Sequence, residues 1–154
     1  MKQLFLVASL MLSVSTYAQW EVGHYVDEFG SKTGETYLFQ TCLGIFSNSA
    51  TINSKCSYFM EHMVSSNLIG ITIYPYGRNT PESWYDDTFQ TAKIKKPSGD
   101  IVSIEVFCVD GMIYLDGKEY DQFMEETKEP GEYTMVMRHV TPYGESSYRF
   151  TFYN

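Results

Sequence analysis

The alternation of apolar and polar residues with a period of two constrains the fold of this chain more than any other feature. Within Ile101–Val109, for example, one face of an extended segment carries Val102, Ile104, Val106 and Cys108. A period of two in segments rich in β-branched and aromatic residues is typical of β-strands with one buried face. The pattern recurs along almost the whole chain between short turn signals, so the sequence predicts an all-β protein.

The same pattern divides the chain into strands and turns. Strands are predicted over residues 20–27, 37–46, 54–63, 68–76, 88–95, 101–109, 112–115, 132–140 and 146–153. The glycine-bearing segment Phe29–Thr36 and the longer segment Gly77–Asp87 are predicted to be loops. Regular turn spacing of this kind indicates an antiparallel β-sandwich or open barrel of about eight or nine strands.

One segment departs from the β pattern. In Lys118–Thr127, Tyr120, Phe123 and Met124 form an apolar stripe with helical spacing, and Pro130 follows. We therefore expect one short helix in the C-terminal third, covering an open end of the β structure.

The N-terminus has the features of a secretory signal peptide. A positive charge at Lys2 precedes the apolar run Leu4–Val14, and Thr16 and Ala18 are small residues at the positions that signal peptidase reads. We expect residues 1–18 to be removed and residues 19–154 to form a single β domain that is periplasmic or extracellular. Loss of Lys2 changes the formal net charge from −8 to −9. Such an acidic chain is a poor match for nucleic acid and for membrane surfaces.

Three cysteines follow this segment, and an oxidising compartment allows them to pair. Cys42 and Cys56 flank the turn Ser47–Ala50, and they would lie opposite each other in a hairpin centred on Ser49. The sequence thus predicts a Cys42–Cys56 disulfide and a reduced Cys108. If the register differs, all three are small core residues instead.

Several stretches resemble a family of small β proteins encoded by bacteria and their phages. These are the DEFGxxTG pattern of Asp27–Gly34, the GxFSNSAT pattern of Gly44–Thr51, Ile73–Gly77 and the ending Tyr148–Phe152. The resemblance spans nearly the whole chain after the signal segment. Because we know of no activity for this family, the resemblance implies a shared β fold and no site residues.

The long loop Gly77–Asp87 holds the best candidate for a ligand site. Aromatic rings beside carboxylates suit a sugar or peptide, because the rings cover an apolar face while the acids accept protons. The candidate residues are Arg78, Asn79, Trp84, Tyr85, Asp86 and Asp87. The alternative is that Trp84 folds back onto the core. We expect Trp84 to be partly exposed.

Two other polar segments have simpler interpretations. The three acids of Asp27–Glu35 could suit calcium, but they lack EF-hand spacing, and a tight loop with acids capping backbone N–H groups is the better interpretation. Ser47–Ser49 could contact a sugar, yet these residue types more often bond their own backbone in a turn.

Motifs for catalysis, metals or cofactors are missing from the sequence. There is no G-x-S-x-G elbow, no CxxC and no HxxxH. We therefore expect a small binding module for a glycan or a protein, without cofactor, metal or catalytic residues. The second hypothesis is a structural protein that self-associates through a sheet edge. The third, a hydrolase, depends only on loop carboxylates such as Asp86 and Asp87.

Overall fold

The computed structural model describes residues 20–74, 88–109, 111–141 and 144–154. Its strands are β1 (Glu21–Val26), β2 (Lys32–Asn48), β3 (Thr51–Met63), β4 (Leu68–Tyr74), β5 (Thr88–Lys95), β6 (Ile101–Val109), β7 (Met112–Leu115), β8 (Glu132–Thr141) and β9 (Gly144–Tyr153). A short 3-10 turn, η1 (Val64–Ser66), links β3 to β4, and the helix α1 (Gly117–Glu126) follows β7. The prediction of an antiparallel all-β fold with one helix in the C-terminal third is confirmed.

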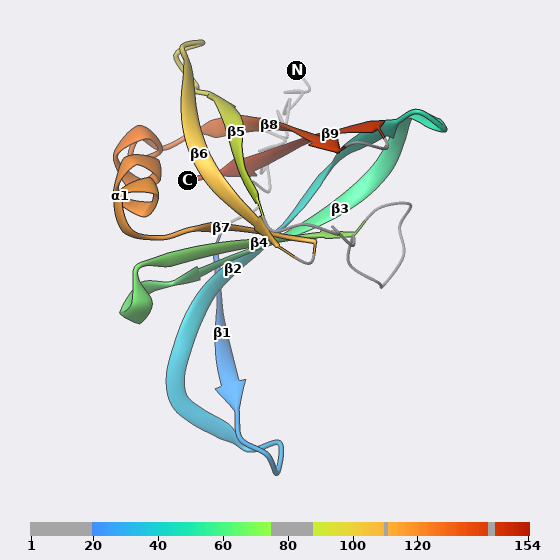
Figure 1. Ribbon diagram of the computed structural model, residues 1–154. Coiled ribbons are helices and arrows are strands. Elements are labelled where there is room, and N and C mark those ends of the chain that lie inside the picture. Colours follow the sequence, from blue (N-terminus) through green and yellow to red (C-terminus); the bar gives the residue numbers. More distant parts are fainter. Residues whose placement is uncertain (1–19, 75–87, 110, 142–143) are drawn as a thin grey trace, which may run out of the picture.

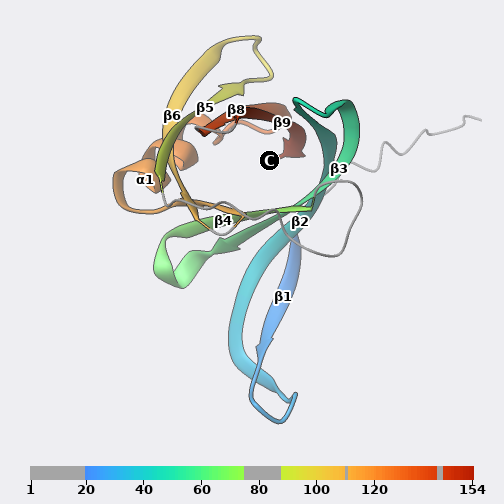
Figure 2. The same ribbon diagram turned by 45° about the vertical axis from the view of Figure 1, so that its right-hand side comes forward.

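The strands form one antiparallel sheet that closes on itself (Figures 1 and 2). Neighbouring strands follow the order β1-β2-β3-β4-β7-β6-β5-β8-β9, and a further pairing of β2 with β9 completes the ring. Strands β2 to β9 thus make an eight-stranded closed barrel with β1 as one extra strand. Of the two predicted architectures the barrel is the one observed, and it is closed.

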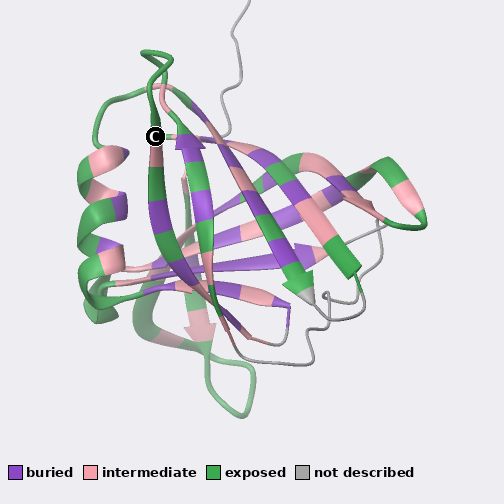
Figure 3. Ribbon diagram, turned by 45° about the horizontal axis from the view of Figure 1, so that its top comes forward, coloured by how far each residue is buried: buried purple, intermediate pink, exposed green. Residues whose placement is uncertain are grey.

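The barrel interior is packed with apolar side chains rather than hollow. Buried residues alternate with exposed ones along the strands (Figure 3). The inward-facing side chains include Phe46, Tyr58, Met60, Ile71, Ile94, Val106, Ile113, Met135, Tyr148 and Phe150. Eight strands enclose a space just wide enough for side chains to fill. A ligand site is therefore to be sought on the outer surface.

Strand β2 pairs with β3 along one edge, and along its other edge it changes partner from β1 to β9. Its first part pairs with β1, and the two project from the barrel as an arm, whereas Gly44 to Ser47 pair with β9. A side chain at position 44 would not fit, because a Cβ there would lie 2.7 Å from Cε2 of Tyr58 and 2.8 Å from Cα of Phe150. Gly44 therefore permits the close approach of β2 and β9 that closes the barrel.

The buried side chain of Gln40 continues this seam where the backbone pairing stops. Its Nε2 donates to the carbonyl oxygen of Tyr153 at 3.1 Å, and its Oε1 accepts from the backbone N–H of Tyr153 at 3.1 Å. The amide thus takes the place of a backbone partner. This explains how a polar side chain that is only 1% exposed is accommodated in the core.

Helix α1 packs over one end of the barrel. Tyr120 and Phe123 are its buried residues, and the ring of Phe123 stacks on that of Phe152 at 5.7 Å between centroids. The hydroxyl of Tyr120 lies 2.9 Å from Nε2 of His62, and Trp20 meets the same imidazole edge-on. Because His62 and Phe152 face the interior, the helix closes the core at this end.

The two polar segments that could have contacted calcium or a sugar, near Asp27 and near Asn48, form turns. Oδ1 of Asp27 accepts from the backbone N–H groups of Phe29 and Ser31, and Gly30 has a φ of 79°. Oδ1 of Asn48 accepts from the N–H of Ala50. The predicted loop Phe29–Thr36 is too long, however, because β2 already begins at Lys32. Lys32 and Thr36 pair with Val26 and His24 of β1, and the register shifts between these two pairs.

Candidate functional site

The predicted loop site lies outside the described residues. This applies to all six of its members, namely Arg78, Asn79, Trp84, Tyr85, Asp86 and Asp87. The exposure of Trp84 and the role of the loop acids therefore stay predictions.

The predicted Cys42–Cys56 disulfide is wrong. Cys42 pairs with Tyr58 across the β2–β3 ladder, and Cys56 pairs with Gly44. The hairpin is therefore centred one residue later than Ser49, which moves the partner of Cys42 by two residues. The two cysteines become a diagonal pair, whose Cα atoms are about 7–8 Å apart in such ladders and thus beyond disulfide reach.

All three thiols are buried in the barrel and none forms a disulfide. Burial raises the pKa of Cys42 and of Cys108 to about 12 in each case. The Sγ of Cys56 lies 3.1 Å from the carbonyl oxygen of Tyr74, to which it donates. The cysteines are therefore small core residues, the alternative that the sequence left open.

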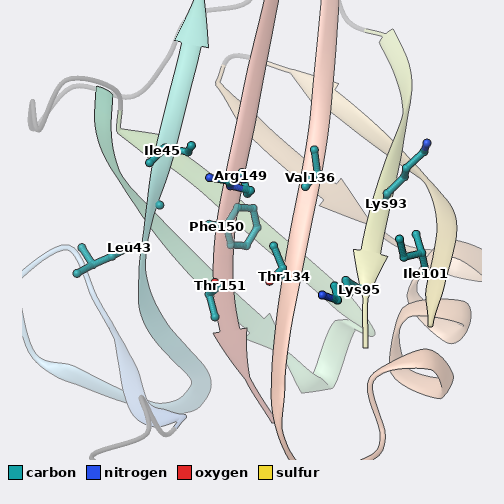
Figure 4. Close-up of a pocket in the computed structure, with 11 residues that line it drawn as sticks. Leu43, Ile45, Lys93, Lys95, Ile101, Thr134, Val136, Arg149, Phe150 and Thr151 are labelled. Atoms are coloured by element: carbon teal, nitrogen blue, oxygen red, sulfur yellow. The ribbon is translucent and has the colours of Figure 1, made fainter. Parts of the chain in front are cut away.

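The structure instead presents a shallow groove on the outer face of β2, β9, β8 and β5 (Figure 4). It has a volume of about 600 Å³. Its lining combines basic, aliphatic and hydroxyl side chains, chiefly Leu43, Ile45, Lys93, Lys95, Ile101, Thr134, Val136, Arg149 and Thr151. A neighbouring pocket adds Lys55 beyond Ile45. We call this surface the basic groove.

The register of the strands arranges these side chains in a row. Lys93 pairs with Val136, Val136 pairs with Arg149, and Arg149 pairs with Ile45. Ile45 in turn pairs with Lys55. A basic and an aliphatic residue thus alternate across five neighbouring strands, and Figure 4 shows the first four of these side chains side by side. Neighbouring strands are about 4.8 Å apart, so successive positive charges are about 10 Å apart along the row.

The four cations of the basic groove lie apart from the ion pairs found among the described residues. Within the described part of the chain, no carboxylate forms an ion pair with Lys55, Lys93, Lys95 or Arg149. Other basic residues do have acidic partners, as where Lys118 lies 3.3 Å from Glu119 and 3.6 Å from Glu105. The groove therefore concentrates unpaired positive charge on a chain whose formal net charge is −8.

Aliphatic side chains beside these charges are also exposed. Leu43 is 75% exposed and Ile101 is 64% exposed. Ile101 pairs with Lys95. Leu43 and Ile101 lie on opposite sides of the groove in Figure 4. The lining offers aliphatic contacts together with charge, while its aromatic member Phe150 is buried.

Sequence reasoning missed this surface. The local signal was the alternation Lys93-Ile94-Lys95, which places two lysines on the face of a strand opposite a buried isoleucine. The other two cations are distant in sequence, at Lys55 and Arg149, and join the row only through β2–β3 and β2–β9 pairing. Composition and net charge do not reveal that the sheet closes into a barrel.

The described residues form neither a metal-binding cluster nor a membrane-spanning helix. They contain no group of three or more His, Cys, Asp or Glu side chains suited to hold a metal ion. They also contain no helix long and apolar enough to cross a membrane.

Comparisons with protein-family models, with curated proteins and with solved structures found no match for this chain. The resemblance to small bacterial and phage-encoded β proteins therefore stays a prediction.

Proposed function

We propose that this protein is an exported binding module whose basic groove binds an acidic amphipathic helix of a partner protein. The observation that carries the proposal is the row of alternating cations and aliphatic residues, none of whose cations is paired within the described residues. Unpaired charge in a row attracts a partner of opposite charge and increases its association rate.

The spacing of the row favours a helix over an extended peptide. One step of the row, from a cation to the next aliphatic residue, is about 4.8 Å, the spacing of neighbouring strands. An α-helix advances about 5.4 Å per turn, so acidic and apolar residues at alternate turns follow the row closely. Alternate residues of a strand are about 6.8 Å apart, which departs further. The long side chains of Lys93 and Arg149 can absorb the smaller mismatch.

The lining also favours a polypeptide over a sugar. Binding sites for sugars usually place an aromatic ring against the apolar face of the ring. The groove exposes Leu43 and Ile101 instead, which match the aliphatic side of an amphipathic helix. A glycan is the other ligand class expected from the sequence, and the binding experiment includes a polyanionic glycan for comparison.

The experiment is a binding titration with a designed probe. The probe is a fluorescent alanine-based peptide carrying glutamate and leucine at alternate helical turns, and its control has glutamine in place of glutamate. We expect the acidic peptide alone to bind, with an affinity that falls as salt is raised. Lys93→Glu should weaken binding about tenfold or more, because it removes one charge pair from the row and adds a repulsion.

Lys32→Glu is the matched control. Lys32 is an exposed lysine on β2 near the tip of the arm, it has no ion-pair partner among the described residues, and its replacement changes the net charge equally. Binding should survive this change. Equal weakening by both substitutions would show that only net charge matters. Dextran sulfate binding as tightly as the peptide would favour a polyanionic glycan. Either result contradicts the proposed partner.

Self-association through a sheet edge, the second hypothesis, has less support. Among the described residues, β2 through β9 each have a neighbouring strand on both sides, and β1 pairs with β2 alone. The aromatic residues of the last hairpin, Tyr148, Phe150 and Phe152, face the core and are each 1% exposed. These rings therefore pack in the interior and do not offer an apolar surface for assembly.

Export is the remaining part of the proposal. It is supported by the charged start, the short apolar run and the small residues Thr16 and Ala18. Mass spectrometry of secreted material should find Gln19, or its cyclised form, at the N-terminus. Retention of Met1 on the secreted protein would contradict it.

A further inference from the structure

The arm formed by β1 and the first part of β2 presents exposed apolar residues at its tip. Phe29 lies in the turn between the two strands and is 84% exposed, and Val26, the last residue of β1, is 61% exposed. Aromatic side chains carry much of the binding energy in protein interfaces and are enriched there. An exposed ring at the end of a projecting hairpin is therefore suited to anchor a contact with another molecule.

The turn holds Phe29 in a fixed position. Oδ1 of Asp27 accepts from the backbone N–H of Phe29 at 2.9 Å and from that of Ser31 at 2.8 Å. The backbone N–H of Gly30 donates to the carbonyl oxygen of Asp27 at 3.0 Å, and the N–H of Asp27 donates to that of Ser31 at 2.8 Å. Binding through a turn that is already ordered costs less conformational entropy than binding through a loop that must become ordered.

The charge of this tip is opposite to that of the basic groove. Asp27, Glu28 and Glu35 are exposed, and none of the ion pairs found among the described residues includes them. Lys32 is the one basic residue between positions 26 and 36, so three acids and one base give this segment a formal net charge of −2. The tip thus combines negative charge with apolar side chains, as the groove combines positive charge with aliphatic ones.

The tip cannot reach the groove of its own molecule. Lys32, beside the tip, and Leu43, at the rim of the groove, are eleven positions apart on β2. This corresponds to roughly 36 Å along the strand. Figures 1 and 2 show the arm leaving the barrel and pointing away from it. A contact between the tip and the groove must therefore join two molecules.

We propose that the arm tip of one molecule docks in the basic groove of a second copy of this chain. The proposal rests on the proposed function, because it uses the same affinity of the groove for an acidic, partly apolar segment. Phe29 would lie against the aliphatic lining, and its neighbouring carboxylates would face Lys93 and Arg149, which have Val136 between them in the row. A groove of about 600 Å³ has the size of a site for a small ligand, so it suits a hairpin tip.

Such a contact is head-to-tail, because the tip and the groove are different surfaces. A molecule that has joined one neighbour still has a free tip or a free groove, so assembly can continue into a ring or a filament. This contact does not involve the pairing of sheet edges. Because it fills the groove, it also excludes the acidic helix of a partner, and self-assembly would therefore regulate the proposed function.

The test uses two variants that each remove one half of the contact. Phe29→Ser removes the anchor from the exposed turn, and Lys93→Glu reverses a charge in the groove. Sedimentation equilibrium in about 0.15 M salt, which screens the repulsion between two acidic chains, measures the mean mass from about 10 μM to about 1 mM protein. We expect the mass of the wild type to rise with concentration, and each variant alone to self-associate about tenfold more weakly or less.

Mixing the two variants should restore association. The intact tip of the Lys93→Glu protein can enter the intact groove of the Phe29→Ser protein, and growth should stop at two chains because the remaining tip and groove are both altered. Phe89→Ser is the control, since Phe89 is 64% exposed on β5 but lies neither on the arm nor in the lining of the groove. This variant should associate as the wild type does.

Three results would each overturn the docking. They are a constant monomer mass for the wild type, self-association unaffected by Phe29→Ser, and a mixture that associates no better than its two components.

The acidic helical peptide separates this proposal from the proposed function. It should bind the Phe29→Ser protein, whose groove is intact, and should dissociate wild-type assemblies by competition. Peptide binding to a wild type that stays monomeric would overturn the docking alone. Restored association in the mixture without peptide binding would support the docking and contradict the helical partner. Assemblies that persist in saturating peptide would have their contact outside the groove, which would also overturn the docking.

Discussion

Replacing Gly44 with alanine should open the seam that closes the barrel. The new Cβ would lie 2.8 Å from Cα of Phe150, and ordinary contact begins at 3.4 Å, so the backbones must separate by at least about 0.6 Å. The carbonyl oxygen of Arg149 is closer still. Neither atom belongs to a flexible side chain that can move aside. The strain therefore falls on the β2–β9 pairing itself, which runs over only Gly44 to Ser47.

The expected cost follows from two contributions. Overpacking of a well-packed interior costs about 1–3 kcal/mol. Stretching the neighbouring ladder bonds by a similar distance takes them towards the limit of hydrogen bonding, and each such bond is worth about 0.5–1.5 kcal/mol. We expect Gly44→Ala to lower the free energy of unfolding by about 2–4 kcal/mol.

Gly34→Ala provides a control within the same strand. No atom lies within 4 Å of a Cβ at position 34, so this change should leave stability within about 0.5 kcal/mol or raise it slightly. Urea denaturation of both variants measures the difference, and hydrogen exchange should show faster exchange along β9 in Gly44→Ala. If the two alanine variants are equally stable, the account of the seam is wrong.

Two further predictions concern buried groups. Because burial raises the pKa of Cys42 and Cys108 to about 12, we expect no thiol to react in the native protein at about pH 8, and three per chain to react after unfolding without reductant. Fewer than three would indicate a disulfide. Burial lowers the pKa of His62 below 6.5, so below that pH the unfolded chain binds more protons and the native state loses stability as pH falls through the folded pKa. The urea midpoint should therefore fall less between about pH 7.5 and about pH 5 in His62→Phe, which also loses the bond to Tyr120. An unchanged difference between the two pH values would contradict this role of His62.

Most of the strand pattern could be predicted from the sequence, because it depends on local alternation. The segment Ile101–Val109 is a strand as expected, with Ile104, Val106 and Cys108 buried. The helix was predicted from the stripe that includes Tyr120 and Phe123, and both are buried. Periodicity reports which face of an element is apolar, and such faces are buried in a domain of this size.

The register could not be predicted in the same way. A hairpin centred on Ser49 or one residue later satisfies the same alternation, yet only the second separates Cys42 from Cys56. The bulge between Phe46 and Asn48 determines which of these two registers the hairpin adopts. Such an irregularity depends on the turn and on neighbouring strands, which the local pattern does not describe.

The candidate sites were the least predictable part. The sequence directed attention to the aromatic and acidic loop around Trp84, which lies outside the described residues. The basic groove is assembled from strands far apart in the chain, such as those that carry Lys55 and Arg149.

The sequence by itself determined an acidic, mostly β chain with one short helix in its C-terminal third and an apolar face that is buried on most of its strands. Only the tertiary structure decided that the sheet closes, which brings Gly44 against Phe150 and places cations from three strands, β3, β5 and β9, in one row. The physical reason is the range of the interactions. Alternation and turn propensity act between residues close in the chain, whereas closure depends on the pairing of β2 with β9, about a hundred residues later.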